Sequence, residues 1–309
     1  MLGVIGIPPA AGGGGVQYNW AFFGGGTTGT GDAGVTTSTR TYGLGDATWA
    51  SEDSLSTAVF NAAAFGDKVN GWIIGGYTGS VNATQNRKYT NTDGSSMSST
   101  AGSTTSVTMQ NGWRGGATTS TGYVFGGTFV STSRKYSISG DSWSAGTALT
   151  SENGWMATHN NATYALVSGG YDNSPAGNLD RNERFTFSDD TRAAQTALGT
   201  ARRELTATGD QSFSYLYCGT TSAVVNTIEK ISLTDGTQSS TFTNSASLRF
   251  AEAAGSDTKG AFAGGQSGLP GSTITTTREI VYADGDDTAG TALPTATAQM
   301  AAFSGIQVS

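Results

Sequence analysis

The sequence predicts an all-β fold: a β-propeller of six sheets, in which a C-terminal strand joins the first sheet. Two sequence landmarks recur six times with a shared period of about fifty residues, as expected for stacked structural repeats. The composition agrees, with 46 glycines among 309 residues, only 13% charged residues and 10% aromatic residues. So much glycine accompanies tight turns or disorder, and the aromatic content favours a packed interior.

The first landmark is an apolar strand that ends in a pair of glycines. The copies are spaced by 51, 51, 43, 49 and 46 residues, and cysteine replaces the first glycine of the fifth copy. An apolar side chain stands two residues before each pair, which indicates a core-facing strand position. The pairs are Gly24-Gly25, Gly75-Gly76, Gly126-Gly127, Gly169-Gly170, Cys218-Gly219 and Gly264-Gly265, and the apolar residues are Phe22, Ile73, Val124, Val167, Leu216 and Phe262.

The second landmark is a charged residue followed two places later by a large apolar one. Its copies are separated by 47, 47, 49, 46 and 49 residues, which repeats the first period independently. Residues two apart on a strand share a face. We therefore expect the apolar residue to pack between neighbouring sheets, with the charge nearer a rim. The pairs are Arg40/Tyr42, Arg87/Tyr89, Arg134/Tyr136, Glu183/Phe185, Glu229/Ile231 and Arg278/Ile280.

A tryptophan follows the tyrosine of two copies by seven residues, at Trp49 and Trp143. With the glycine pairs, the tyrosines and the period, this pattern resembles the kelch family across residues 17–309. The chain departs from the family at Cys218 and in the four copies that lack the tryptophan. The resemblance implies a kelch-like propeller. It implies no particular activity, because kelch domains serve many unrelated purposes.

The ends of the repeat array predict how the ring closes. The first copy begins directly with its Gly-pair strand, and residues 297–309 resemble the small-residue strands that precede the other pairs. These strands contain Ala62-Ala63-Ala64, Ala253-Ala254 and Ala301-Ala302. Radial closure removes the open sheet edges. We therefore expect the C-terminal strand to become the innermost strand of the first blade, and residues 17–309 to form one domain.

Residues 1–16 form an apolar, glycine-rich segment ahead of the first repeat. They contain no basic residue, unlike a signal peptide, and no run of about 20 apolar residues that would span a membrane occurs in the chain. Exposed apolar side chains favour docking on a neighbouring subunit. We interpret the segment as a docking arm that uses Leu2, Val4, Ile5 and Ile7, with a frayed terminus as the alternative.

The residue inventory argues against most chemistry. The net charge is −7 with five lysines, which disfavours nucleic acid as a partner. A single histidine, His159, and a single cysteine, Cys218, provide neither a catalytic triad nor a metal site. Carboxylate pairs at Asp189-Asp190 and Asp286-Asp287 would suit a glycosidase, but they fall in predicted hairpin turns, where aspartate serves locally. We expect no cofactor, no metal and no enzyme activity, with a glycan-active enzyme as the less favoured alternative.

The loops after the glycine pairs vary in length, and variable loops on a constant scaffold commonly carry binding. The longer ones, residues 27–39, 171–180 and 266–277, are rich in Gly, Thr, Ser and Asn. Aromatic residues near the loops would stack on sugar rings. Two adjacent arginines would place charge at the channel mouth, but solvated or rim-paired arginines are the favoured interpretation. The candidate binding residues are Tyr77, Trp113, Tyr171, Arg202 and Arg203.

The texture of the sequence, with little lysine or cysteine and abundant Thr, Ser and Gly, resembles virion structural proteins of tailed bacteriophages. This resemblance implies a non-enzymatic tail, tail-fibre or decoration protein located in the virion. Its arm would bind other virion proteins, and its loops would contact a host surface glycan or protein. The alternatives are a kelch-type protein-binding adaptor, extracellular or cytoplasmic, and a glycan-active enzyme.

Overall fold

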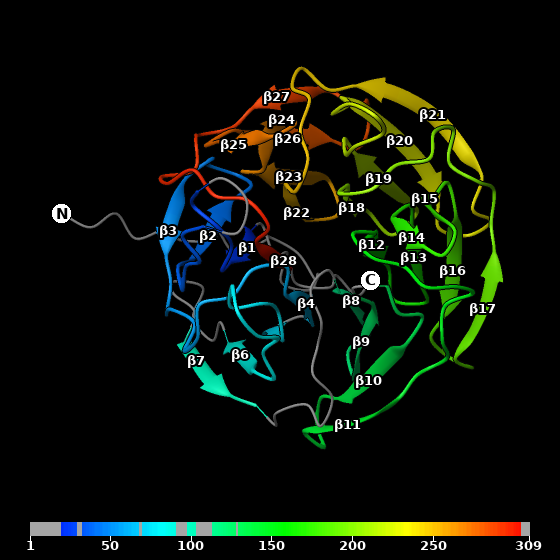
Figure 1. Cartoon of the computed structure of the whole chain (residues 1–309), viewed down its shortest axis with the longest axis horizontal. Coiled ribbons are helices and arrows are strands. Elements are labelled where there is room, and N and C mark those ends of the chain that lie inside the picture. The colour runs from blue at the N-terminus through cyan, green and yellow to red at the C-terminus, as the bar shows by residue number, and fades with distance from the viewer. Residues whose placement is uncertain are drawn as a thin grey trace, which may run out of the picture.

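The computed structural model describes residues 20–29, 33–67, 70–90, 98–102, 113–127 and 129–303, with the backbone alone at Ser98 and Trp113. Within these residues, six four-stranded antiparallel sheets surround a central axis as the blades of a propeller (Figure 1). Two further two-stranded hairpins extend from blades 4 and 6. The predicted fold class is confirmed.

Blades 1 to 3 are given from the axis outward. Blade 1 contains β28 (Ala301–Phe303), β1 (Trp20–Gly24), β2 (Thr39–Gly43) and β3 (Trp49–Ser51). Blade 2 contains β4 (Ala63–Gly66), β5 (Asn70–Ile74), β6 (Asn86–Thr90) and β7 (Ser98–Ala101). Blade 3 contains β8 (Trp113–Ala117), β9 (Thr121–Gly126), β10 (Ser133–Ser137) and β11 (Ser142–Ala145).

Blades 4 to 6 follow the same order. Blade 4 contains β12 (Ala157–Asn160), β13 (Tyr164–Ser168), β16 (Asn182–Thr186) and β17 (Thr191–Ala194), with the hairpin β14 (Tyr171–Asn173) and β15 (Ala176–Asn178). Blade 5 contains β18 (Thr206–Gly209), β19 (Phe213–Tyr217), β20 (Thr227–Ser232) and β21 (Gln238–Thr243). Blade 6 contains β22 (Glu252–Gly255), β23 (Lys259–Ala263), β26 (Thr277–Val281) and β27 (Asp287–Ala289), with the hairpin β24 (Gln266–Gly268) and β25 (Gly271–Thr273).

The ring closes as the sequence predicts. Strand β28 pairs antiparallel with β1, so that Phe303 lies opposite Phe22. Their rings stack at 4.6 Å, and Phe303 meets the Trp20 ring edge-on at 6.1 Å. A Cβ placed on Gly71 of blade 2 would lie 1.7 Å from the Phe303 ring, so Phe303 packs directly on that backbone. One side chain therefore joins both ends of the described chain to the neighbouring blade.

The structure corrects the first glycine pair. In blade 1 the left-handed residues are Gly25 and Gly26, with φ of 68° and 102°, and Gly24 is the last residue of β1. The strand position opposite the charged residue is therefore Phe23, which lies opposite Arg40, while Phe22 is also buried in the core. The other five pairs are left-handed at the expected positions. The run of three glycines in blade 1 left the register ambiguous by one residue.

The two residues of each pair have different tasks. The first bends the chain where a side chain has little room: a Cβ on Gly25 would lie 2.4 Å from the Val59 carbonyl oxygen. Cys218 alone tolerates this position with a side chain, at φ 53°. In four blades the second residue donates its N–H to a carbonyl that leads into the next blade: Gly26 to Val59 (2.7 Å), and Gly170 to Arg202, Gly219 to Leu248 and Gly265 to Thr297 (2.8 Å each).

A second set of left-handed residues lies two places before the innermost strands. They have φ between 50° and 60° and, unlike glycine, they carry side chains: Asn61, Trp155, Glu204, Phe250 and Gln299. In four cases the N–H donates to the carbonyl of the equivalent residue in the preceding blade, at 2.8 to 3.0 Å. These hydrogen bonds run from Asn61 to Gln299, from Gln299 to Phe250, from Phe250 to Glu204 and from Glu204 to Trp155. In blade 3 the equivalent position, Gly112, lies outside the described residues. Among the described residues, these backbone hydrogen bonds thus link blades 4, 5, 6, 1 and 2 in succession at one end of the channel.

The second landmark is confirmed in its apolar half, because all six apolar residues are at most 2% exposed: Tyr42, Tyr89, Tyr136, Phe185, Ile231 and Ile280. Two of the charged partners, Glu183 and Glu229, are also buried, and each accepts a hydrogen bond from the connection that leaves the preceding blade. The donors are the backbone N–H groups of Thr150 (3.3 Å) and Gly199 (3.0 Å). The charge therefore links blades.

The two faces of the disc differ. One face carries the glycine pairs and the connections into the innermost strands, and we call it the Gly-pair face. The opposite face carries the inner hairpin turns, where a side-chain oxygen accepts the N–H three residues ahead. These oxygens belong to Asp67, Thr118, Asn161, Asp210 and Ser256. We call this the turn face.

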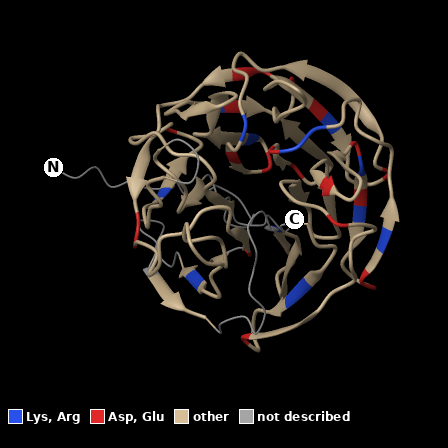
Figure 2. Ribbon diagram, viewed as in Figure 1, with Lys and Arg blue, Asp and Glu red and all other residues tan. Residues whose placement is uncertain are grey.

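Charged residues gather on blades 4 to 6, whereas blades 1 to 3 carry few (Figure 2). Between blades 2 and 3, the rings of Phe65, Trp72 and Tyr136 pack against one another with centroids 5.3 to 6.1 Å apart. Aromatic rings also pack between blades 5 and 6, where the centroids of Tyr217 and Phe262 lie 4.7 Å apart. Among the described residues, no helix is long and apolar enough to cross a bilayer.

Replacing Phe303 by alanine should destabilise the whole ring, because the side chain is 4% exposed and joins blades 1 and 2. The expected loss is about 3 kcal/mol of unfolding free energy, measured by thermal or denaturant unfolding. Leu269→Ala is the control, since Leu269 is 45% exposed. Equal stabilities of the Phe303 variant and the control would contradict closure through β28.

Candidate functional site

Three aromatic rings and one arginine meet on the Gly-pair face where blades 3, 4 and 5 adjoin. Phe129 comes from the loop between β9 and β10, Trp155 precedes β12, and Tyr171 begins β14. The ring centroids are 5.5 to 5.9 Å apart. Arg203, which precedes β18, has its Cζ 4.9 Å from the Tyr171 centroid and 6.0 Å from that of Trp155. We call these four residues the aromatic–arginine cluster.

The guanidinium of Arg203 is fixed on Tyr171 by hydrogen bonds. Its Nε pairs with Glu204 Oε1 at 3.1 Å, and its Nη1 donates to Asn178 Oδ1 at 2.9 Å. Glu204 is 5% exposed and is itself held by Arg249 (3.2 Å) and by the Thr220 hydroxyl (2.8 Å). A buried carboxylate with several partners orients its arginine well. The arginine side chain remains 27% exposed.

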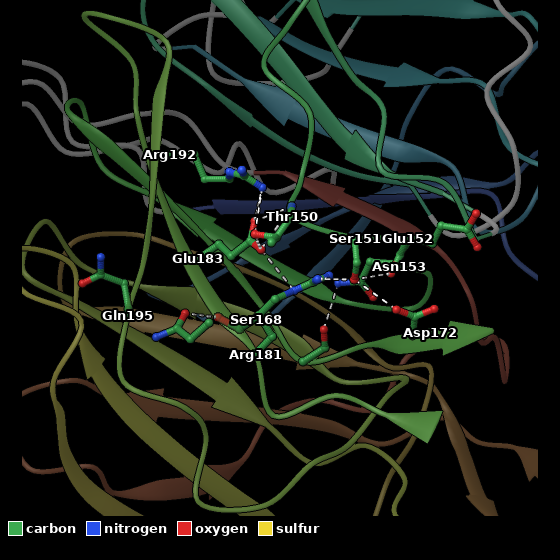
Figure 3. A network of polar contacts seen from close by, with 12 residues as sticks. Thr150, Ser151, Glu152, Asn153, Ser168, Asp172, Arg181, Glu183, Arg192 and Gln195 are labelled. Carbon is green, nitrogen blue, oxygen red and sulfur yellow. Dashed lines mark hydrogen bonds and ion pairs between the residues drawn. The ribbon is translucent and has the colours of Figure 1, made fainter. Parts of the chain in front are cut away.

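A polar network holds the segment that carries Trp155 (Figure 3). Glu183 lies at its centre and pairs with Arg181 at 3.2 Å and Arg192 at 3.6 Å, and it accepts a hydrogen bond from the Thr150 hydroxyl. Arg181 also donates to the Ser151 hydroxyl.

The network continues to both sides of the cluster. The Ser151 hydroxyl donates to Asp172 Oδ2 at 3.0 Å, beside Tyr171 at the start of β14. Asn153 Nδ2 donates to the Gly169 carbonyl at 3.0 Å, two residues before Trp155. Both aromatic residues of blade 4 therefore stand on a backbone tied to the same buried charge.

The candidate residues from the sequence separate in space. Tyr171 and Arg203 come together in the cluster. Tyr77 occupies the same position as Tyr171, directly after a glycine pair, but in blade 2, where it packs edge-on against Phe60 at 5.5 Å. Trp113 begins β8, and its side chain lies outside the described residues, as do the arm residues Leu2, Val4, Ile5 and Ile7.

Arg202 lies away from the surface and not at a channel mouth. Its side chain is fully buried, with Nη1 3.0 Å from Glu229 Oε1. Neighbouring residues in an extended segment point to opposite sides, so Arg203 faces outward while Arg202 enters the space between blades. Arg202 is therefore paired, as the alternative held, but its pair is buried between blades and does not lie at a rim.

Sequence reasoning missed Phe129 and Trp155. Trp155 is one of the left-handed residues that precede the innermost strands, with φ of 54°. Phe129 is also left-handed, with φ of 55°. Left-handed backbone is uncommon for bulky residues and often marks functional positions. The sequence around each residue is that of an ordinary loop. The two residues stand out only in the folded structure, where three blades adjoin. A usable signal in the sequence would have been the shared spacing of the residues that precede the innermost strands.

The groups that catalysis would need are distributed elsewhere. His159 lies on β12, where its Nε2 donates to the Asp210 carbonyl (3.1 Å) and burial lowers the pKa of the imidazole. Burial raises the pKa of the Cys218 thiol to about 11. Asp189 caps its hairpin turn by accepting from the N–H of Thr191, as expected, whereas Asp287 binds Arg278 at 2.9 Å. In the part of the chain described, no three His, Cys, Asp or Glu residues gather as a metal site.

The channel is lined mainly by small residues and contains two adjoining cavities. The cavity toward the turn face has a volume of about 90 Å³ and includes His159, Asp210 and Asp257 in its lining. The cavity toward the Gly-pair face has about 40 Å³ and contains a buried ion pair, Arg114 Nη2 to Glu252 Oε1 at 2.9 Å. Because these residues come from blades 3 and 6, the pair crosses the channel.

No family model matches the chain, and no curated protein shows significant similarity to it.

Burial raises the pKa of Glu252 to about 7, although Arg114 acts in the opposite direction. A carboxyl group whose pKa is higher in the folded state stabilises the fold below its unfolded pKa, and this contribution is lost as the pH rises through the folded pKa.

We therefore expect the stability of the native protein relative to a Glu252→Gln variant to fall as the pH rises from about 4.5 to about 7. The change should be roughly 3 kcal/mol, measured by thermal unfolding of both proteins across this range. A difference between the two proteins that does not change with pH would contradict the raised pKa.

Proposed function

We propose that this protein is a non-enzymatic recognition module that binds a glycan at the aromatic–arginine cluster. The observation that carries the proposal is the meeting of three half-buried aromatic rings with an oriented arginine, whose Cζ lies 4.9 Å from the Tyr171 centroid. Glycan rings have an apolar C–H face and a polar hydroxyl edge. Aromatic faces suit the first, and oriented guanidinium and amide groups suit the second.

The surroundings of the cluster support this proposal. The β14–β15 hairpin beside it carries Asn173 and Ser174, whose polar groups suit hydroxyl-rich ligands. The cluster residues come from three blades, so their spacing is set by a rigid scaffold and not by one loop. Preformed geometry limits the entropy that is lost on binding. The residues that catalysis would use are buried, paired or remote from the cluster.

We further propose that the module is a structural component of a tailed-bacteriophage particle, on the tail, the tail fibre or the head surface. The support is the sequence texture, the resemblance of the repeats to the kelch family, and the apolar arm at residues 1–16. The arm would bind other virion proteins, while the cluster contacts glycans of the host surface.

Tyr171→Ala and Trp155→Ala should each weaken glycan binding at least about tenfold, because each removes a stacking face. The measurement is a glycan array followed by titration calorimetry on the best ligand. Tyr77→Ala is the matched control, since Tyr77 holds the equivalent position in blade 2. If the control loses as much affinity, or the native protein binds no glycan, the proposed site is wrong. Recovery of cleaved glycan would favour the enzyme alternative.

Deleting residues 1–16 should leave a folded propeller that no longer enters particles. The copy number per purified particle, measured by mass spectrometry, should fall to background while the circular dichroism of the isolated protein is unchanged. Serine at Leu2, Val4, Ile5 and Ile7 keeps the length and removes only the apolar contacts. Normal incorporation of both variants would dismiss the arm as a docking segment.

A further inference from the structure

The ion pair in the channel joins two equivalent positions of the repeat. Arg114 lies opposite Phe125 and Glu252 lies opposite Ala263, and in each case this partner directly precedes the first residue of the glycine pair. Blades 3 and 6 are three places apart in a ring of six, so they face each other across the axis (Figure 1). The two side chains therefore reach toward the axis from opposite sides and meet at 2.9 Å.

The other four equivalent positions hold small, uncharged residues: Ala63, Ala157, Thr206 and Ala301. Of the described residues that line this cavity, only Arg114 and Glu252 are charged, and the others are alanine, glycine and threonine. The repeat is thus interrupted at two opposed positions, with opposite charges.

Neighbouring charges are already paired. Lys259, on the strand next to β22, has its Nζ 3.2 Å from Glu279, and Arg249, three residues before Glu252, pairs with Glu204. Arg114 and Glu252 are 8% and 7% exposed, so the pair is shielded from solvent. A buried ion pair is weak evidence for stability, because taking two charges out of water costs several kcal/mol each. Such a pair is better explained by a geometric task.

We propose that Arg114 and Glu252 form a strut across the channel that fixes the distance between the opposed blades 3 and 6. Other links described above join neighbouring blades, and small errors in their angles add around a ring. A connection across the diameter limits the accumulated error. The two side chains also fill the channel at its Gly-pair end, so the larger of the two cavities opens toward the turn face.

A double-mutant cycle at pH 8 tests the strut. Arg114→Met should lower the melting temperature by roughly 5–15 °C, because it leaves the Glu252 carboxylate buried without its counter-charge. The double variant, which has no charge at either position, should recover at least half of that loss. If the single variants do not fold, folding of the double variant supports the coupling, and its failure to fold overturns it.

Hydrogen exchange separates a strut from simple charge balance. In the double variant, amides of β8 and β22 should exchange at least tenfold faster than in the native protein, while those of β4 and β18 keep their native rates. The swapped variant Arg114→Glu/Glu252→Arg should regain native protection in β8 and β22. Native protection in the double variant, or no regain in the swapped one, would overturn the proposal.

A surface ion pair of the same length serves as the control. Lys135 and Asp190 join blades 3 and 4 at 2.9 Å, and their side chains are 28% and 26% exposed. Lys135→Met and Asp190→Asn should each change the melting temperature by only about 1–2 °C. Effects there as large as those at Arg114 and Glu252 would show that the channel pair has no special role.

Discussion

The backbone hydrogen bonds that pass from blade to blade around the Gly-pair face are the constraint on which the architecture depends. Each uses a residue with a side chain in left-handed conformation, which costs of order 1 kcal/mol or more per position. The chain accepts this cost at Asn61, Trp155, Glu204, Phe250 and Gln299. The N–H of the second glycine adds a parallel link, as from Gly170 to the Arg202 carbonyl. The blades are thus bonded through their backbones as well as packed.

The same hydrogen bonds position residues of the candidate site. Trp155 and Glu204 are equivalent residues of neighbouring blades, and the N–H of Glu204 donates to the Trp155 carbonyl (2.8 Å). One supplies an aromatic face and the other orients Arg203. The relative position of these two groups is therefore tied to a backbone hydrogen bond between blades 4 and 5. Binding at this position would draw on rigidity that the fold already maintains.

The architecture could be predicted from sequence because two unrelated features share one period, and because the C-terminal strand lacks a following glycine pair. The limit appears at Gly24, Gly25 and Gly26, where repeated identical residues hide the register. Tyr171 and Arg203 could be found as loop residues, whereas Arg202 could not be distinguished from its neighbour without knowing which of them faces outward. Arg114 escaped notice because it precedes Gly115-Gly116, and its match to Glu252 depends on aligning two dissimilar inner strands.

The inner hairpin turns show how far such a sequence can diverge without structural change. Aspartate, threonine, asparagine and serine all perform the same capping bond, at Asp67, Thr118, Asn161, Asp210 and Ser256. What each position requires is an oxygen at the right reach, a demand on chemistry and not on identity. Because several residue types meet this requirement, the sequences of the six copies diverge from one another and from those of distant homologues. In chains of this kind, common ancestry would then remain visible in the repeat period after residue identities have diverged.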